Sequence, residues 1–177
     1  MQNSHVKKLT LSAMFIAIGI LLPMVTANIP EIGMALLPMH LPVLLAGLIV
    51  GAKHALLIGA IVPIARYFIF GMPVLFPMGA SMALELATYG LVIGIIYGMF
   101  LNRNIVTLYT SLVIAMLAGR IVWGVSMAIF MGIQGGSFSM EAFVTGAFVT
   151  AIPGIILQLV LIPIVMIALK KARLIHD

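Results

Sequence analysis

Three ionisable side chains lie deep inside long apolar stretches of the chain, where a charge needs a partner. Arg66, Glu85 and Arg120 each fall well away from the ends of such a stretch. At mid-depth in a bilayer such a group costs at least about 2.5 to 3.5 kcal/mol, so it faces the protein interior or water and pairs. Two arginines against one glutamate leave a positive surplus, and arginine binds a carboxylate through two parallel N–H donors. These residues predict a polar pocket that accepts an anionic ligand.

Two neighbouring side chains extend this candidate site. Tyr89 follows Glu85 by four residues and therefore lies on the same face of a helix. Trp123 brings an indole N–H donor to within one helical turn of Arg120, with small glycines on either side of the pair. Both side chains are predicted to line the pocket.

Each of these residues also has a purely structural interpretation. Glu85 and an arginine can form an ion pair that only fixes helix packing, and Arg66 can reach outward to the membrane surface. His40, between Pro38 and Pro42, is more often a hydrogen-bonded packing residue than a ligand. The 14 methionines are too dispersed along the chain to indicate a metal path, so neither a metal site nor a cofactor is predicted.

The composition places these residues in a membrane protein. Of 177 residues, 64% are hydrophobic and 7% are charged, and the mean hydropathy is +1.31. A soluble domain carries about 25% charged residues because water must solvate its surface. The chain has no cysteine, which excludes disulfides and thiol–metal sites. We expect an all-α, polytopic membrane protein that forms a single integral membrane domain over residues 1–177.

Six segments are long and apolar enough to cross a bilayer, which takes about 20 predominantly apolar residues. The first follows a lysine pair but has no clear small-residue cleavage site, so it is interpreted as a retained helix rather than a signal peptide. Residues 71–77, with two prolines, are expected to form a loop or the start of a re-entrant segment. The six predicted spans are residues 9–24, 35–50, 55–70, 78–101, 105–131 and 141–169.

The basic residues outside the spans give the orientation. With six spans they all fall on one side of the membrane, together with both termini, whereas the opposite loops carry Glu31 and Glu141. Cytoplasmic loops are enriched in lysine and arginine, so both termini are predicted to be cytoplasmic. This partition also explains the pI of about 9.9 without nucleic acid as a partner. The residues concerned are Lys7, Lys8, Lys53, Arg103, Lys170, Lys171 and Arg173.

Small residues at helical spacing predict close helix packing, as they do in lipid. The spacing occurs at Ala13 and Ala17, at Gly47 and Gly51, and along the series Gly90, Gly94 and Gly98. The chain has no glycine-rich phosphate loop with its lysine and no hydrolase or metalloprotease motif. If this protein pumps a substrate, a partner must therefore supply the energy.

Three stretches together resemble a known family. They are Lys7–Ala17 with its Ala-x-x-x-Ala spacing, Leu37–Gly47 followed by the short turn at Gly51, and Phe76–Gly90. They are similar to the first, second and fourth helices of the substrate-binding S components of energy-coupling factor (ECF) vitamin transporters. The resemblance covers nearly the whole chain.

That resemblance implies a subunit of the prokaryotic plasma membrane that binds one vitamin from outside. It would dock through Ala13 and Ala17 on a transmembrane coupling protein (EcfT-type) driven by two ATPase subunits (EcfA-type). The loop at residues 27–31 would act as a lid over the binding site. The residues implied in binding are Glu85, Tyr89, Arg120, Trp123, Gln134, Arg66, His40 and Asn28.

The positive surplus favours an acidic cargo, and among the family's cargoes pantothenate is a small carboxylate with hydroxyl and amide groups. Pyridoxine or a hydroxymethylpyrimidine-type precursor is the alternative. Two other classes of function stay open on sequence alone. One is an intramembrane enzyme that uses Glu85 and His40 as acid and base, and the other is a scaffold whose buried charges are only structural.

Overall fold

All regular secondary structure in the computed structural model is helical, and the structure describes residues 2–26 and 30–174. Several membrane spans consist of more than one element, because short 3₁₀ or π-helical turns join their parts. The elements in order are α1 (Gln2–Leu21), η1 (Leu22–Thr26), α2 (Pro30–Leu36), α3 (His40–Ile49), α4 (Ala52–Phe70), η2 (Leu75–Gly79), α5 (Ala80–Met99), α6 (Ile105–Ile133), α7 (Met140–Val144), η3 (Thr145–Val149) and α8 (Ile152–Lys171).

Six helical stretches of the described chain are long and apolar enough to cross a membrane, as predicted. Two of them are interrupted. The second breaks between α2 and α3, where Leu37 has a φ of 51°, and the sixth breaks between η3 and α8. The predicted loop at residues 71–77 agrees with the structure: η2 begins at Leu75, but Phe76 within it has an extended backbone (φ −130°, ψ 130°), so the continuous helix of the fourth span starts after Phe76. The six stretches are His5–Met24, Glu31–Ile49, Ala52–Phe70, Leu75–Met99, Ile105–Ile133 and Met140–Lys171.

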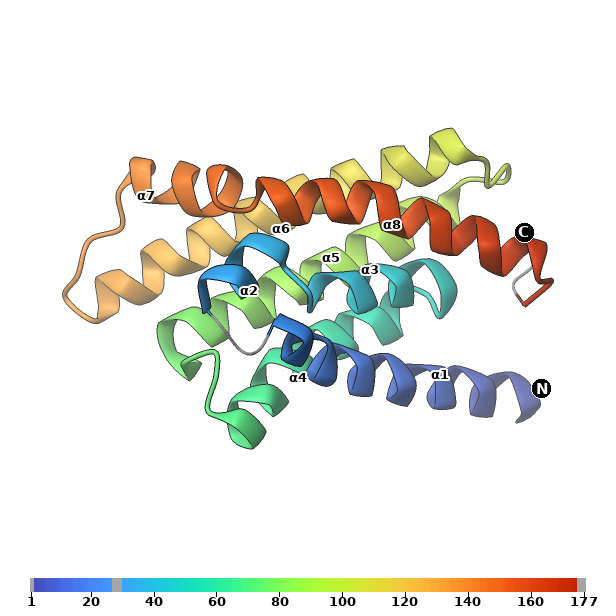
Figure 1. Cartoon of the computed structure of the whole chain (residues 1–177), viewed down its shortest axis with the longest axis horizontal. Coiled ribbons are helices and arrows are strands. Elements are labelled where there is room, and N and C mark those ends of the chain that lie inside the picture. Colours follow the sequence, from blue (N-terminus) through green and yellow to red (C-terminus); the bar gives the residue numbers. More distant parts are fainter. Residues whose placement is uncertain (1, 27–29, 175–177) are drawn as a thin grey trace.

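The two termini lie at the same end of the elongated bundle, together with the loop between α5 and α6 (Figure 1). An even number of spans requires this arrangement. At this end Lys170 donates a hydrogen bond from Nζ to the carbonyl oxygen of Arg103, at 2.7 Å, which joins the end of α8 to the α5–α6 loop. Lys170 and the loop that contains Arg103 thus share the end that holds both termini, and the assignment of that end to the cytoplasm stays a prediction.

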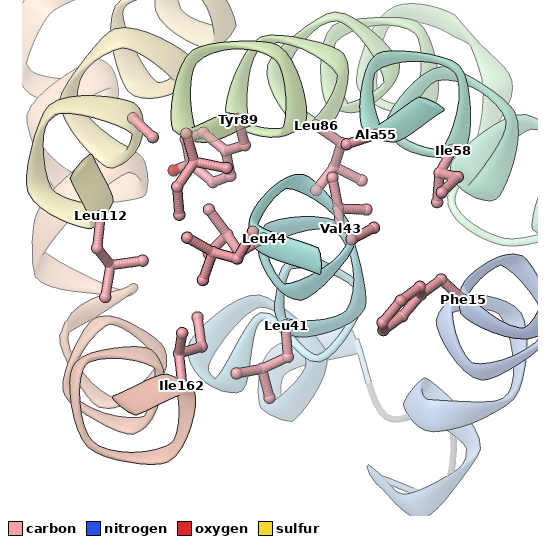
Figure 2. Close-up of a cluster of buried hydrophobic side chains, with 14 of the residues drawn as sticks. Phe15, Leu41, Val43, Leu44, Ala55, Ile58, Leu86, Tyr89, Leu112 and Ile162 are labelled. Carbon is pink, nitrogen blue, oxygen red and sulfur yellow. The ribbon is translucent and has the colours of Figure 1, made fainter. Parts of the chain in front are cut away.

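The short helix α3 is the centre of the bundle, and most of its residues are buried. Val43 and Leu44 are fully buried and point in different directions (Figure 2). Val43 points toward α4 and α5, and Leu44 points toward α6 and α8. Phe15 of α1 packs against the same core. The longer helices therefore wrap around α3, which places its first residue, His40, inside the bundle.

Glycines let α3, α4 and α5 approach at backbone distance. A Cβ on Gly90 would lie 2.5 Å from the carbonyl oxygen of Ala55, and one on Gly94 would lie 2.5 Å from the backbone nitrogen of Ala52. Gly47 faces Gly90 in the same way, at 2.9 Å from its carbonyl oxygen. The predicted small-residue contact is confirmed for these three, but it is wrong for Gly51 and Gly98, where an added Cβ would meet no other part of the described chain within 4 Å.

Candidate functional site

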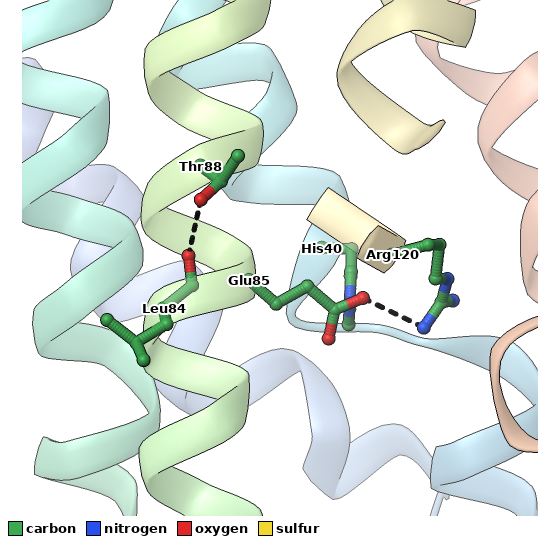
Figure 3. A network of polar contacts seen from close by, with 5 residues as sticks. All are labelled: His40, Leu84, Glu85, Thr88 and Arg120. Carbon is green, nitrogen blue, oxygen red and sulfur yellow. Dashed lines mark hydrogen bonds and ion pairs between the residues drawn. The ribbon is translucent and has the colours of Figure 1, made fainter. Parts of the chain in front are cut away.

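Glu85 of α5 and Arg120 of α6 meet in the interior of the bundle. Arg120 donates a hydrogen bond from Nη1 to Oε1 of Glu85, at 2.8 Å, and the two residues are 5% and 1% exposed (Figure 3). Nε2 of His40 lies 3.5 Å from the same carboxylate oxygen. Residues from three helices thus form one buried polar cluster, although 35 residues separate Glu85 from Arg120.

The break in the second span brings His40 to this cluster. The chain turns at Leu37, and the backbone N–H of His40 donates to the Leu37 carbonyl at 3.1 Å. The ring of His40 then packs edge-on against Tyr89, with centroids 5.2 Å apart. Irregular backbone at membrane depth is tolerated where it lines a cavity, because exposed polar groups then find partners away from lipid. The break therefore indicates a cavity beside His40.

A cavity of about 480 Å³ lies beside this cluster, within the size range of small-molecule sites. Glu85, Arg120 and His40 form its polar part together with Arg66. Trp123 and Phe138 supply aromatic surface, and most of the remaining wall is thioether and aliphatic. Its other lining residues are Pro23, Gly33, Met34, Leu37, Pro38, Met39, Met72, Pro73, Val74, Met78, Met82, Met127, Gly146 and Thr150.

Several buried polar atoms of this cluster have no hydrogen-bond partner within the described residues. They include Nε and Nη2 of Arg120 and both ring nitrogens of His40. Nε and Nη2 form the side edge of the guanidinium, whose two parallel N–H donors match a carboxylate. Because buried polar groups in native proteins are normally hydrogen-bonded, these atoms mark a place for a ligand or an ordered water.

A family model for the substrate-specific component of ECF transporters matches residues 7–166 of the chain. The chain belongs to this family. No curated protein and no solved structure gave a significant match. The chain is accordingly a multi-pass membrane protein and the substrate-capture subunit of an ECF transporter. Subunits of this kind take up a small molecule and work together with a coupling protein and ATPase subunits, and they are not enzymes.

Arg66 of this S component lines the cavity but is held differently from Arg120. It donates a hydrogen bond from Nη1 to the carbonyl oxygen of Ile20, at 2.7 Å, and lies over the ring of Phe70, 5.2 Å from the ring centroid. The residue is 4% exposed, so it does not reach outward to the membrane surface. Arg66 instead joins α4 to the end of α1 and contributes positive charge to the cavity wall.

The remaining predicted binding residues have different positions. Trp123 lines the cavity and packs against Phe138, with ring centroids 5.8 Å apart. Tyr89 is fully buried behind His40 and is not among the lining residues. Gln134 caps α6 in an exposed turn, away from the lining, because α6 continues past the cavity to Ile133. Asn28 lies outside the described residues.

The expected lid is only partly described. Residues 27–29 are outside the described chain, and Pro30 already begins α2, so the predicted loop is replaced by a helix from this point on. Gly33 and Met34 of α2 line the cavity. In this S component a short helix therefore covers part of the site where the sequence predicted a loop.

Sequence reasoning missed one feature of the site and one buried polar side chain that is not part of its lining. Six methionines line the same cavity, although they are scattered from residue 34 to residue 127 and no spacing pattern links them. Gln158 of α8 is fully buried, and neither polar atom of its amide has a partner within the described residues. A glutamine in the middle of an apolar span was the available signal, but the sequence does not show what it faces.

Proposed function

We propose that this S component captures a small carboxylate-bearing vitamin from outside the cell, with pantothenate as the first candidate. The observation that carries the proposal is the side edge of Arg120. One end of its guanidinium is bound to Glu85, while Nε and Nη2 have no partner within the described residues. A ligand carboxylate on that edge would complete the hydrogen bonding of a charge that is already buried.

The charges of the cavity wall support an anionic cargo. Arg66 and Arg120 contribute two positive charges and Glu85 one negative charge among the described lining residues, with His40 counted as neutral. In a low-dielectric environment, a wall with more positive than negative side chains attracts an acidic ligand and repels a cationic one.

Other lining residues suit the hydroxyl and amide groups of pantothenate. The two ring nitrogens of His40 are able to donate and accept, and Trp123 and Thr150 add an indole N–H and a hydroxyl. These groups come from α3, α6 and the start of the turn before α8, so they surround the cavity rather than extend along one helix.

A pyridoxine or hydroxymethylpyrimidine-type cargo is the second candidate, and the methionines favour it. Six thioether side chains together with Trp123 and Phe138 form a soft, polarisable wall. Methionine sulfur makes favourable contacts with aromatic rings, which such a cargo has and pantothenate lacks. The two candidates differ in charge, so a matched pair of ligands separates them.

The experiment is a thermal-shift screen of the purified subunit with pantothenate, its alcohol analogue pantothenol, and pyridoxine. A ligand at 100 times its dissociation constant stabilises the folded state by about 2.7 kcal/mol. We expect a clear shift with pantothenate and a much smaller one with pantothenol, because the alcohol cannot bind the Arg120 edge as an anion.

Two arginine variants provide the matched control for that screen. Arg120→Gln should lose the pantothenate shift, each shift being measured against the variant's own ligand-free melting point. Arg103→Gln removes the same charge at the opposite end of the bundle and should retain the shift. A shift with pyridoxine alone would replace pantothenate by the second candidate, and an absence of shifts with every vitamin would refute the proposal.

We also propose that α1 carries the docking surface for the coupling protein. Ala13 and Ala17 are exposed on one face of α1, whereas Ser12, Phe15 and Gly19 on its other side are buried against the bundle. Small exposed residues at i and i+4 allow a partner helix to approach closely in lipid. This face is therefore available without any change in the packing of α1.

A further inference from the structure

A second cavity of about 200 Å³ lies between α6 and α8, two neighbouring helices in Figure 1. Among its described lining residues only Arg120 is polar, and only Arg120 is shared with the larger cavity. We name it the α6–α8 cleft. Its lining residues are Val113, Met116, Leu117, Arg120, Phe148, Ile155 and Leu159.

The α6–α8 cleft opens toward the surroundings of the bundle. Val113 and Leu117 on its rim are 44% and 50% exposed, while Met116 in its wall is 7% exposed. The two rim residues belong to α6, and the rest of the lining comes from α6, η3 and α8, which all lie in membrane-spanning stretches. The medium in front of the opening is therefore the hydrocarbon region of the bilayer.

The shape of the cleft departs from ordinary helix packing. Its α6 residues follow an i, i+3, i+4, i+7 stripe, and Ile155 and Leu159 follow i, i+4 on α8. Such stripes normally interdigitate and leave no space of this size. Here the sixth span is interrupted next to the cleft. The backbone N–H of Thr150 bonds to the Thr145 carbonyl in a wide π-type turn, and α8 begins only at Ile152.

The chemistry of the cleft selects its occupant. A bound water needs two to four polar partners, and the described lining offers only one polar side chain, Arg120. A partner helix, about 10–12 Å across, is too wide for a cleft of this volume. An acyl chain is apolar, narrow and abundant in the surrounding bilayer.

We propose that the α6–α8 cleft binds one acyl chain of a membrane phospholipid. The bound chain covers the aliphatic stem of Arg120 from the lipid side, while the guanidinium remains with Glu85 on the side of the larger cavity. It therefore seals the buried ion pair at the point where α6 and α8 leave a space. This inference does not depend on the identity of the cargo.

The test is native mass spectrometry of the full-length subunit, purified in mild detergent without any vitamin. We expect a single phospholipid to be retained by the wild-type protein. Leu159→Trp fills the cleft and should lower the retained fraction at least about fivefold, because close packing leaves no room for both an indole and the chain. Val160→Trp adds the same side chain at the next position, which is 52% exposed and not part of the lining, and should retain the lipid.

Two further measurements separate cleft filling from misfolding and from head-group binding. Ile155→Ala enlarges the cleft and should not lower retention. Phosphatidylglycerol and phosphatidylcholine with identical chains should be retained to a similar extent, because the one charged side chain of the described lining, Arg120, already pairs with Glu85. Failure of the wild-type protein to retain lipid, equal retention by Leu159→Trp, loss in Ile155→Ala, or retention of the anionic lipid alone would each overturn the proposal.

Discussion

The buried ion pair between Glu85 and Arg120 permits a test that needs no knowledge of the cargo. We consider the single substitutions Glu85→Met and Arg120→Met and the double variant that carries both. Methionine is apolar and flexible, it matches glutamate in length and is shorter than arginine, and it removes each charge without adding a polar group. The three variants together form a double-mutant cycle.

The geometry sets the expected magnitude. Oε1 of Glu85 and Nη1 of Arg120 are 2.8 Å apart, and the side chains are 2% and 6% exposed, so each charge would be left desolvated without the other. Removal of one partner of a buried ion pair costs about 3–5 kcal/mol, whereas replacement of both by apolar residues is often neutral or stabilising. We expect each single variant to be strongly destabilised and the double variant to be close to the wild-type protein.

The assay is the reversible unfolding of the purified subunit in mixed micelles, with the free energy of unfolding measured for all four proteins. The single variants should raise the equilibrium constant for unfolding by a factor of about 100 or more, since about 1.4 kcal/mol corresponds to tenfold. A coupling energy below about 0.5 kcal/mol would refute the reasoning, because such a value is typical of residues that do not interact.

A second cycle with Arg66→Met in place of Arg120→Met controls for the loss of positive charge in the cavity wall. Arg66 donates a hydrogen bond to the carbonyl oxygen of Ile20, and a change at Glu85 should leave this hydrogen bond intact. The two substitutions should therefore be close to additive. A coupling as large as that between Glu85 and Arg120 would mean that the cavity responds to total charge rather than to the specific pair.

Three further predictions concern packing, docking and capping. Gly119→Ala places a Cβ against the ring of the buried Tyr89 and should lower the free energy of unfolding by about 1–3 kcal/mol. Gly98→Ala, with open space around it, should be neutral or stabilising in the same assay. Replacement of Ala13 and Ala17 by leucine should abolish uptake by cells that contain the complete transporter, while the thermal shift of the purified subunit with ligand persists. A loss of both uptake and thermal shift would mean that these residues are needed for folding rather than for docking. Asn104→Ala removes the side-chain oxygen that caps α6 and should cost about 1 kcal/mol, again measured by unfolding, with no change in ligand affinity.

The sequence alone determined the class and the number of spans. Composition and the length of the apolar segments depend only on the bilayer thickness and on the cost of burying charge, so they needed no tertiary information. The same cost identified Arg66, Glu85 and Arg120 as residues that require partners. The enrichment of lysine and arginine in cytoplasmic loops placed the basic residues outside the spans on one side together with both termini, and the structure places both termini at one end of the bundle.

The tertiary structure decided which charges pair and what surrounds them. Arg120 binds Glu85 whereas Arg66 binds the carbonyl of Ile20, and no property of two arginines in a sequence distinguishes these outcomes. The six methionines of the cavity come from segments that only the helix packing brings together, since lipid and protein interior are equally apolar and hydropathy cannot tell which face of a span points inward. Hydropathy also does not reveal the break before His40, because the residues around it are mostly apolar. The break depends on the backbone turn at Leu37, and this turn places an imidazole beside the buried ion pair.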